Sequence, residues 1–233
     1  MGCRASGPYS REERREKRRG KAEKMRKFRQ KYYDWFSHVY DRFIAMHASG
    51  QQGMLKTVLA EKAELEKGGR ILDICTGTGA LLNYLHRRLE NGGMVVGVDF
   101  SGGMLGVARG KTAGANRLFL VQADVSRLPF KEDAFDTVTC AHAFYELKGG
   151  DQESCLREIG RILKPGKPFL MMEHDVPRKP LIRMLFYIRL MSMGAKKAFE
   201  ILRHEKEILG QYFSSVEKIT VSGGRSKILV CRR

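Results

Sequence analysis

Residues Ile71 to Leu82 read ILDICTGTGALL, in which an apolar run meets a glycine-containing turn and then resumes with helical spacing. The run before the turn predicts a buried strand, and the spacing after it predicts a helix. Because glycine has no Cβ, the backbone at Gly77 and Gly79 can approach a ligand closely. The amides that begin the following helix point toward the same place. The stretch therefore predicts a ligand-binding turn between a strand and a helix.

Strand-like and helix-like segments alternate outward from this turn. Strands are predicted at 70–74, 93–100, 117–124, 134–141 and 167–174, and helices at 80–90, 103–111 and 151–163. Because strands joined through helices run parallel, this order predicts a parallel sheet covered on both faces. Strands at 214–221 and 226–233 flank Ser222-Gly223-Gly224, which is a hairpin signal. The expected fold is α/β: a doubly wound, Rossmann-like, mostly parallel seven-stranded sheet with a C-terminal antiparallel hairpin, in one domain with N-terminal helices.

The length and cysteine content are typical of a single cytoplasmic domain. The chain has 233 residues, of which 42% are hydrophobic, and this is enough for one sizeable core. Its five cysteines are scattered and include no pair at the spacing that metal or redox sites favour, so no metal site is predicted. No apolar stretch approaches the length that crosses a bilayer. We expect a cytoplasmic protein that at most lies on a membrane surface.

Positive charge is concentrated at the two ends of the chain. Residues 1–31 carry 13 Lys/Arg against 4 Asp/Glu, and residues 176–233 also carry 13 against 4, whereas residues 32–175 carry 17 against 18. Basic ends of this kind can bind the phosphates of an anionic membrane or of nucleic acid. A solvated, salt-bridged helix is the alternative interpretation of the first end. The opening MGCRAS also fits the pattern for N-myristoylation.

The residues around the turn discriminate between nucleotide ligands. Asp99 ends the second strand, twenty residues after Gly79, where a carboxylate can accept both hydroxyls of a ribose. A dinucleotide site requires a third glycine, but Leu82 occupies that position. Asp73 would repel a phosphate, yet it can hold an ammonium group. S-adenosylmethionine, an adenosine joined to an amino acid, combines these features.

Several further motifs occur in an order similar to that of the class I S-adenosylmethionine-dependent methyltransferases. The resemblance is strongest to the UbiE-like C-methyltransferases of quinone biosynthesis and their small-molecule relatives. It rests on YD at 40–41, ILDICTGTG at 71–79, VVGVDFSGGML at 95–105, QADVSRLPFKEDAFDTVT at 122–139 and REIGRILKPGKPFLMMEH at 157–174. Two residues depart from the family pattern: Cys75 replaces the usual first glycine of the turn, and Lys167 replaces the second glycine of the common KPGG.

The resemblance implies S-adenosyl-L-methionine as cofactor and a set of residues that bind it. Asp73, Gly77 and Gly79 are expected to contact the methionine part. Asp99 and Phe100 are expected to hold the ribose and adenine, with Met104 close to the adenine. The full expected set is Asp73, Cys75, Gly77, Gly79, Asp99, Phe100, Met104, Asp124, Val125 and Cys140. Asp124 and Val125 are assigned to the adenine amino group.

Candidate catalytic residues lie where the fourth and fifth strands end. The cofactor carries its own leaving group, so the protein supplies mainly proximity and orientation, while a carbon or oxygen acceptor also calls for a base. His142 and Glu173 are the candidate acid–base residues, with His174 beside Glu173. Tyr40, together with Tyr33, is expected to cover the methyl group. A histidine that merely packs or lies on the surface is the alternative interpretation of His142.

The charge distribution, the order of strands and helices, and the resemblance together divide the chain into segments. We expect a basic N-terminal helical arm at 1–31 and a methyltransferase domain at 32–233. Within the domain, we expect N-terminal helices at 32–66, a cofactor-binding core at 67–175, acceptor lid helices at 176–213 and the terminal hairpin at 214–233. Residues 180–202, PLIRMLFYIRLMSMGAKKAFEIL, are unusually apolar for such a lid. This favours a hydrophobic acceptor, although an ordinary amphipathic core helix would show a similar pattern.

The leading hypothesis is therefore in-line methyl transfer from S-adenosylmethionine to a small acceptor that is quinone-like or a lipid. One alternative is an RNA methyltransferase that uses both basic ends. The end of the fourth strand reads CAHAFY, however, and lacks the Asn/Asp-Pro-Pro-aromatic sequence typical of base amino-group methylation. Another alternative is a scaffold protein that binds S-adenosylmethionine without catalysis. The sequence gives no basis for predicting an oligomeric state.

Overall fold

The structure is a computed structural model that describes the sheet and the helices packed against it. It describes Gly20, Lys24, Met184 and residues 27–38, 40–41, 52–89, 92–147, 150–175, 204–221 and 226–233. Most of the expected N-terminal arm at 1–31 lies outside the described residues. The same holds for most of the acceptor lid expected at 176–213. The domain boundaries there stay predictions.

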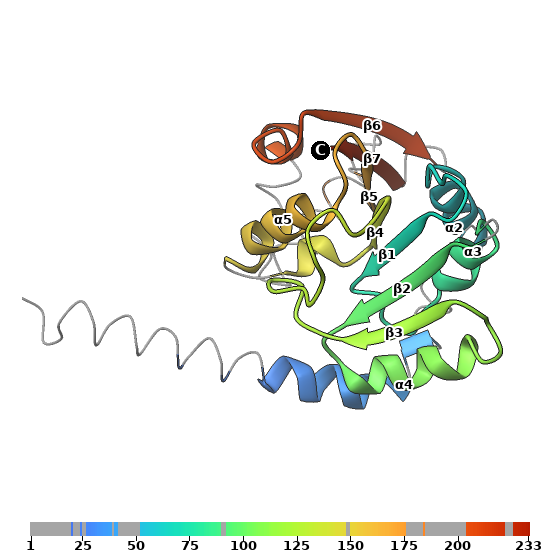
Figure 1. The fold of residues 1–233 in the computed structure, drawn as a ribbon. Helices are drawn as coiled ribbons and strands as arrows, with labels where there is room; N and C mark the ends of the chain where they lie inside the picture. Colours follow the sequence, from blue (N-terminus) through green and yellow to red (C-terminus); the bar gives the residue numbers. More distant parts are fainter. Residues whose placement is uncertain are drawn as a thin grey trace, which may run out of the picture.

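Seven strands in the described residues form one sheet in the order β3-β2-β1-β4-β5-β7-β6 (Figure 1). They are β1 (Arg70–Ile74), β2 (Met94–Asp99), β3 (Leu118–Gln122), β4 (Thr137–Ala141), β5 (Pro168–His174), β6 (Ser215–Val221) and β7 (Ser226–Arg232). The first five strands are parallel, and β7 is antiparallel to both β5 and β6. The predicted fold class, including the C-terminal hairpin, is confirmed.

The described helices include four labelled α-helices and one short 3-10 helix. They are α2 (Gln52–Glu61), α3 (Leu82–His86), α4 (Gly102–Lys111), η1 (Phe144–Glu146) and α5 (Asp151–Ile162). Residues 27–38 and 204–209 are helical as well. The helix predicted at 80–90 is shorter in the structure, because residues 77–81 still belong to the turn. None of the helices in the described part of the chain is long and apolar enough to cross a membrane.

Apolar side chains are buried on both faces of the sheet. On one face Leu72 and Ile74 of β1 pack in a cluster with Ile159 of α5. On the other face Ile71 packs in a second cluster with Leu59 of α2. This second cluster also includes residues of α3. Because both faces are covered, the central strands are apolar at consecutive positions rather than at alternate ones.

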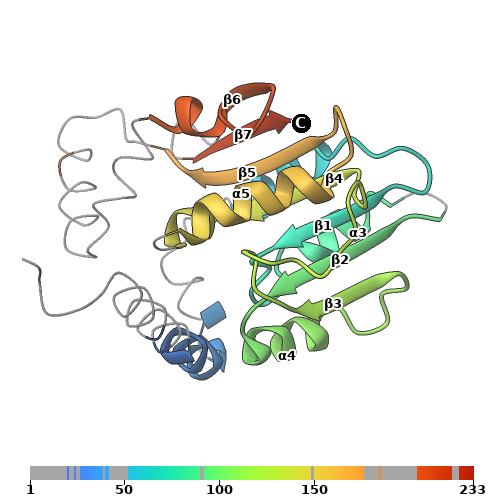
Figure 2. The same ribbon diagram turned by 60° about the vertical axis from the view of Figure 1, so that its left-hand side comes forward.

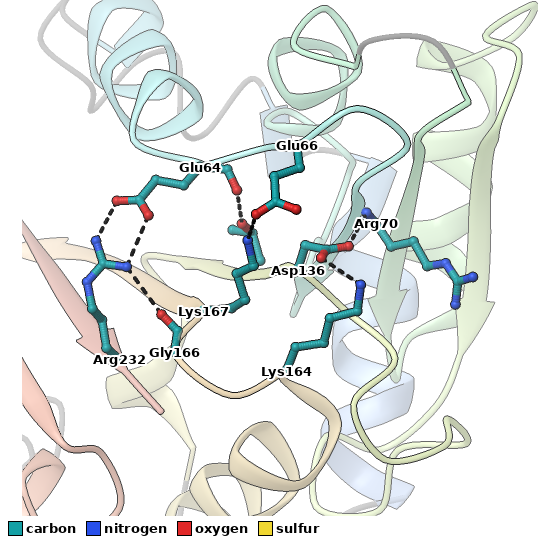
Figure 3. A network of polar contacts seen from close by, with 9 residues as sticks. Glu64, Glu66, Arg70, Asp136, Lys164, Gly166, Lys167 and Arg232 are labelled. Carbon is teal, nitrogen blue, oxygen red and sulfur yellow. Dashed lines mark hydrogen bonds and ion pairs between the residues drawn. The ribbon is translucent and has the colours of Figure 1, made fainter.

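A polar network joins the amino ends of the parallel strands (Figure 3). The glycine turn lies at the opposite, carboxyl ends of these strands. Its pairs are Arg232 with Glu64, Lys167 with Glu66, Lys164 with Asp136, and the backbone N–H of Arg70 with Asp136. Arg232 donates to both carboxylate oxygens of Glu64, at 3.0 and 2.5 Å, and these hydrogen bonds hold the pKa of Glu64 below its usual range. Lys167, one of the two residues that depart from the family pattern, therefore has a structural contact at this end of the sheet.

Gly79 allows α4 to pack directly against the glycine turn. Its φ is +72°, and a Cβ at this position would lie 2.9 Å from Ala108 Cβ and 3.2 Å from Leu82 Cδ1. Real Cβ atoms essentially never approach another heavy atom as closely as the first of these distances. The position therefore requires glycine both for its backbone conformation and for its packing.

Replacement of Gly79 should destabilise the fold more than replacement of a glycine with the same backbone conformation. Gly114 is the matched control, since its φ is +80° and a Cβ there would meet nothing within 4 Å. We expect Gly114→Ala to cost about 1–2 kcal/mol of unfolding free energy from the left-handed backbone alone. Gly79→Ala should cost roughly 1–3 kcal/mol more through overpacking against α4. Urea denaturation of both variants measures the difference, and equal losses would contradict the packing role.

Candidate active site

The candidate site lies at the carboxyl ends of β1, β2 and β4. The glycine turn follows β1, which is the strand between β2 and β4 in the sheet. In doubly wound sheets, ligands bind where neighbouring connections leave for opposite faces. Figure 2 shows the helix at 27–38 beside α4 at this edge of the sheet. The helix thus forms part of the surroundings of the turn.

Three residues of the turn have left-handed backbone conformations: Cys75 at φ 52°, Gly77 at 55° and Gly79 at 72°. The N–H of Thr76 donates to Val98 O of β2 at 2.9 Å and fixes the turn against that strand. A left-handed conformation at a residue with a side chain, such as Cys75, costs about 1–2 kcal/mol. The Cys75 side chain packs against the core cluster, so the turn tolerates this departure from glycine.

Cys140 lies at the end of β4 and is fully buried. The pKa of its thiol is raised well above the usual value by a hydrogen bond with Cys75 and by burial. Both thiols are free. The structure therefore brings Cys75 and Cys140 together, with Cys140 inside the core, and a contact of either one with the cofactor stays a prediction.

Asp73 is buried within the turn and is held by two hydroxyl groups. Thr76 Oγ1 donates to one carboxylate oxygen at 2.5 Å, and Thr139 Oγ1 donates to the other at 2.7 Å. Burial raises the pKa of Asp73 to about 6, although both hydrogen bonds act in the opposite direction. Since a carboxylate oxygen has two lone pairs, each oxygen keeps one that can accept from a ligand.

Asp99 connects the end of β2 to the turn. Its Oδ2 accepts from the N–H of Gly77 at 2.8 Å, and its Oδ1 accepts from the N–H of Ser101 at 2.9 Å. Burial raises the pKa of this carboxyl as well. The spacing in the sequence predicted that Asp99 and the turn lie together, and the structure does bring them together.

The arrangement fits a nucleoside that carries an ammonium group. A Cβ on Gly77 would meet nothing within 4 Å, so there is open space above the turn at this residue. Two buried carboxylates, Asp73 and Asp99, adjoin the turn and keep lone pairs for hydroxyl or ammonium donors. The donor set suits the sugar and amino-acid parts of S-adenosylmethionine, whereas two buried anions would repel a pyrophosphate.

The remaining predicted cofactor residues follow β2 and β3 at the same edge. Phe100 is half-buried, and its ring makes an edge contact with Tyr33 at a centroid distance of 5.6 Å. Met104 is buried in the first turn of α4. Asp124 Oδ1 accepts from the N–H and the hydroxyl of Ser126, at 2.8 and 2.6 Å, and Val125 is buried beside it. Their contacts with adenine stay predictions.

The helix at 27–38 is attached to α4 through a residue that the sequence analysis did not identify. Asp34 Oδ1 accepts from Ser101 Oγ at 2.5 Å and from the N–H of Gly103 at 2.9 Å. A Cβ on Gly103 would lie 2.7 Å from the Asp34 Cα. The two glycines of the SGGML motif were the available signal, because a glycine in a helix often marks a close approach.

The N-terminal region also contacts the turn and the loop after β4. Thr78 Oγ1 donates to Asp41 at 2.8 Å, and Lys111 pairs with Asp41 at 2.6 Å. On the other side, Tyr33 OH donates to Glu146 at 2.7 Å. A further ion pair joins Arg29 to Asp151 at 3.1 Å. These contacts place the helix across the edge of the sheet, from α4 to the start of α5.

His142 follows β4 in a left-handed conformation with φ 54°. Its ring lies 4.5 Å from the ring of His174 between centroids. Its Nδ1 is buried and has no hydrogen-bond partner among the residues that the structure describes. Burial, together with the nearby His174 and Lys56, lowers the pKa of His142 to about 3. The imidazole is therefore neutral near pH 7, and one of its ring nitrogens can accept a hydrogen bond.

Glu173 and Tyr40 have different surroundings. Glu173 is buried, and its Oε1 accepts from the N–H of Phe144 in η1 at 3.0 Å. Burial raises the pKa of Glu173 to about 8, so this carboxyl is mostly protonated at pH 7. Its hydrogen bond with Phe144 anchors η1. Burial and the nearby Glu146 raise the pKa of Tyr40 to about 12, which keeps the phenol neutral. Catalytic roles for both residues stay predictions.

Comparison with known proteins agrees with this fold. Residues 71–166 match the methyltransferase domain family. A demethylmenaquinone methyltransferase of Staphylococcus epidermidis is 31% identical over 190 residues, which cover 80% of this chain and 78% of that protein.

Solved structures with low sequence identity share the fold. An S-adenosylmethionine-dependent methyltransferase of Aquifex aeolicus superimposes with a TM-score of 0.57 at 17% identity, and the match covers 82% of this chain and 96% of the other. A protein assigned to the same activity from Methanococcus maripaludis gives a TM-score of 0.61 at 20% identity, with coverage of 88% and 93%. Together with the 31% identical relative, these matches establish that the chain belongs to the UbiE-like class I S-adenosylmethionine-dependent methyltransferases.

Proposed function

We propose that this S-adenosylmethionine-dependent methyltransferase methylates a small hydrophobic acceptor of the quinol type. The observation that carries the proposal is the similarity to a demethylmenaquinone methyltransferase over 80% of the chain. The apolar sequence at 180–202, in the region where this family builds its acceptor lid, supports it. A quinol also offers an acidic hydroxyl beside a nucleophilic ring carbon, which suits a site that contains a neutral histidine.

Asp73 and Asp99 are the proposed ligands for the cofactor. Asp73 would hold the ammonium group, because its carboxylate is buried and its second lone pairs remain available. Asp99 would hold the ribose hydroxyls, while the missing side chain of Gly77 leaves room for the ligand. The bound cofactor supplies an electrophilic methyl group with its own leaving group. The work left to the chain is to orient the reactants, exclude water and accept a proton.

His142 is the proposed proton acceptor. Its buried Nδ1 has no partner among the described residues, and a hydroxyl of the acceptor would supply the missing hydrogen bond. The depressed pKa keeps the ring neutral, although it also makes the imidazole a weak base. Acceptance of a proton would therefore be coupled to methyl transfer rather than precede it. Tyr33 and Tyr40, on the N-terminal side, would cover the reacting groups and exclude water.

The acceptor can be identified by label transfer. We expect full-length protein, incubated with methyl-labelled S-adenosylmethionine and reduced demethylmenaquinone bearing a short prenyl tail, to place label in the organic phase. Parallel reactions contain RNA or phospholipid instead of the quinol. Label in RNA, or in phospholipid alone, would overturn the quinol proposal. Absence of label in every reaction, with the cofactor shown to bind, would favour a non-catalytic binding protein.

Gly77→Ala should weaken cofactor binding while folding stays close to that of a control. Gly114→Ala is again the matched variant, since both glycines have positive φ and no atom within 4 Å of the added Cβ. We expect Gly77→Ala to raise the Kd for S-adenosylhomocysteine by roughly tenfold or more, because a methyl group would intrude where the ligand lies. Gly114→Ala should leave the Kd unchanged. Isothermal titration calorimetry measures both, and equal affinities would remove Gly77 from the site.

The pH dependence of kcat/KM for the cofactor should follow the protonation of Asp73 rather than that of His142. The pKa of Asp73 is raised to about 6, so the carboxyl takes up a proton as the pH falls through this value and loses its attraction for an ammonium group. The pKa of His142 is about 3, so its ring stays neutral over the same range. Wild-type kcat/KM should therefore fall below about pH 6.

Three variants separate these two groups. Asp73→Asn should abolish the acid limb, whereas His142→Asn should keep it and lower kcat by roughly 100-fold or more. Thr139→Val should move the limb to higher pH, because the Thr139 hydroxyl lowers the pKa of Asp73. Thermal unfolding verifies that each variant is folded. An acid limb that persists in Asp73→Asn, or that disappears in His142→Asn, would contradict the assignment.

A further inference from the structure

The helix at 27–38 exposes three aromatic side chains on the face that is turned away from the active site. Phe28 is 67% exposed, Tyr32 is 48% exposed and Trp35 is 72% exposed. These residues are spaced by four and three positions, so they form one continuous stripe along the helix. Within the described part of the chain, the stripe supplies half of the exposed large hydrophobic residues. Tyr32 also makes an edge contact with Tyr33 at a centroid distance of 5.4 Å, whereas Phe28 and Trp35 take no part in the contacts described for the active site.

Lysines lie alongside the aromatic stripe. Lys24 and Lys31 are exposed, and their spacing places them on the same side of the helix as Phe28 and Trp35. The opposite side carries the groups that attach the helix to the domain, including Asp34 and the buried Ser37. One helix therefore has a face bound to the protein and a second face that is both aromatic and basic.

A helix with this division of side chains suits the surface of an anionic membrane. Aromatic rings favour the boundary between headgroups and acyl chains, and lysines attract anionic lipids. The positive charge that complements an anionic membrane extends beyond the stripe in the sequence, because residues 1–31 carry 13 Lys/Arg against 4 Asp/Glu. Lysines alone would bind any polyanion, including one in solution. The aromatic stripe is the feature that favours a lipid bilayer over a polyanion in solution.

We propose that the face formed by Phe28, Tyr32, Trp35, Lys24 and Lys31 docks on an anionic lipid bilayer, with the helix lying in the plane of the surface. The other side of this helix contacts α4 through Asp34 and the loop after β4 through Tyr33. Docking would thus bring the edge of the active site within about one helix diameter, roughly 10 Å, of the lipid. A hydrophobic acceptor could then reach the site directly; this consequence rests on the proposed function, whereas the docking itself does not.

Trp35 provides a direct test, because it is the only tryptophan of the chain. Full-length protein is mixed with vesicles of phosphatidylcholine that contain phosphatidylglycerol, and with vesicles of phosphatidylcholine alone, at fixed salt. We expect the Trp35 emission to shift to the blue with the anionic vesicles, and brominated acyl chains to quench it. Cofactor and acceptor are left out, so failure of this test is distinguishable from failure of the proposed methyl transfer.

Two pairs of variants test the two halves of the docking face. Phe28→Ser with Tyr32→Ser should weaken vesicle partitioning by about tenfold or more. Phe119→Ser, on the exposed face of β3, should leave it unchanged. Lys24→Glu with Lys31→Glu should reduce partitioning by a similar or larger factor, because each lysine near an anionic surface contributes about fivefold.

The matched charge control is Lys62→Glu with Lys67→Glu, in the exposed loop before β1. It changes the net charge equally and should retain more binding than the variant on the helix. Unchanged Trp35 emission with anionic vesicles would overturn the proposal. So would a blue shift that depends on protein concentration without lipid, which would indicate a second copy on this face. Binding of an RNA oligonucleotide through the same lysines, without binding to vesicles, would overturn it too.

Discussion

The burial of two carboxylates beside a left-handed turn is the constraint on which the rest of the site depends. Asp99 holds the turn by accepting from the Gly77 amide, and Asp73 is held by the hydroxyls of Thr76 and Thr139. Neutral donors offset only part of the cost of burying an anion, and the pKa of each acid is raised accordingly. A ligand with a positive charge would relieve this cost. Burial of these two acids is therefore more compatible with a cationic ligand than with a phosphate.

Acidic side chains at the two ends of the parallel strands have different kinds of partner. At the edge where the parallel strands begin, Glu64 and Asp136 pair with Arg232 and Lys164, so charge is compensated by charge. At the opposite edge, the described partners of Asp73 are hydroxyl groups. The charged pairs at the first of these ends are already complete, whereas the incomplete interactions of Asp73 leave capacity for a ligand. This division explains why a single rigid sheet can carry a site whose polar groups are only partly satisfied.

Much of the fold and part of the site could be predicted from the sequence, because both follow from local periodicity and from fixed spacings. The strands, the hairpin, the glycine turn and the place of Asp99 at the end of β2 belong to this class. The roles of Asp34, Asp41 and Lys111 do not, since each pairs with a residue that lies far away in the sequence and no period relates them. The left-handed conformation of Cys75 could not be predicted either, because residue propensities favour glycine in that conformation. Packing of the Cys75 side chain against the core offsets part of the conformational cost.

The helix at 27–38 is attached to the domain by contacts of a different kind from those that hold the strands together. The helix crosses the edge of the sheet and is held by hydrogen bonds and ion pairs, such as Arg29 with Asp151 and Tyr33 with Glu146. Partly exposed ion pairs each contribute only about 0–1 kcal/mol, far less than the apolar burial that holds the strands together. Loss of these ion pairs would therefore cost the helix less than loss of apolar burial would cost the sheet, although Asp34 and the ring contact of Tyr33 with Phe100 also hold the helix. Methyl transfer needs water excluded during the reaction and the product released afterwards, and a helix held beside the site by several weak contacts would suit both requirements.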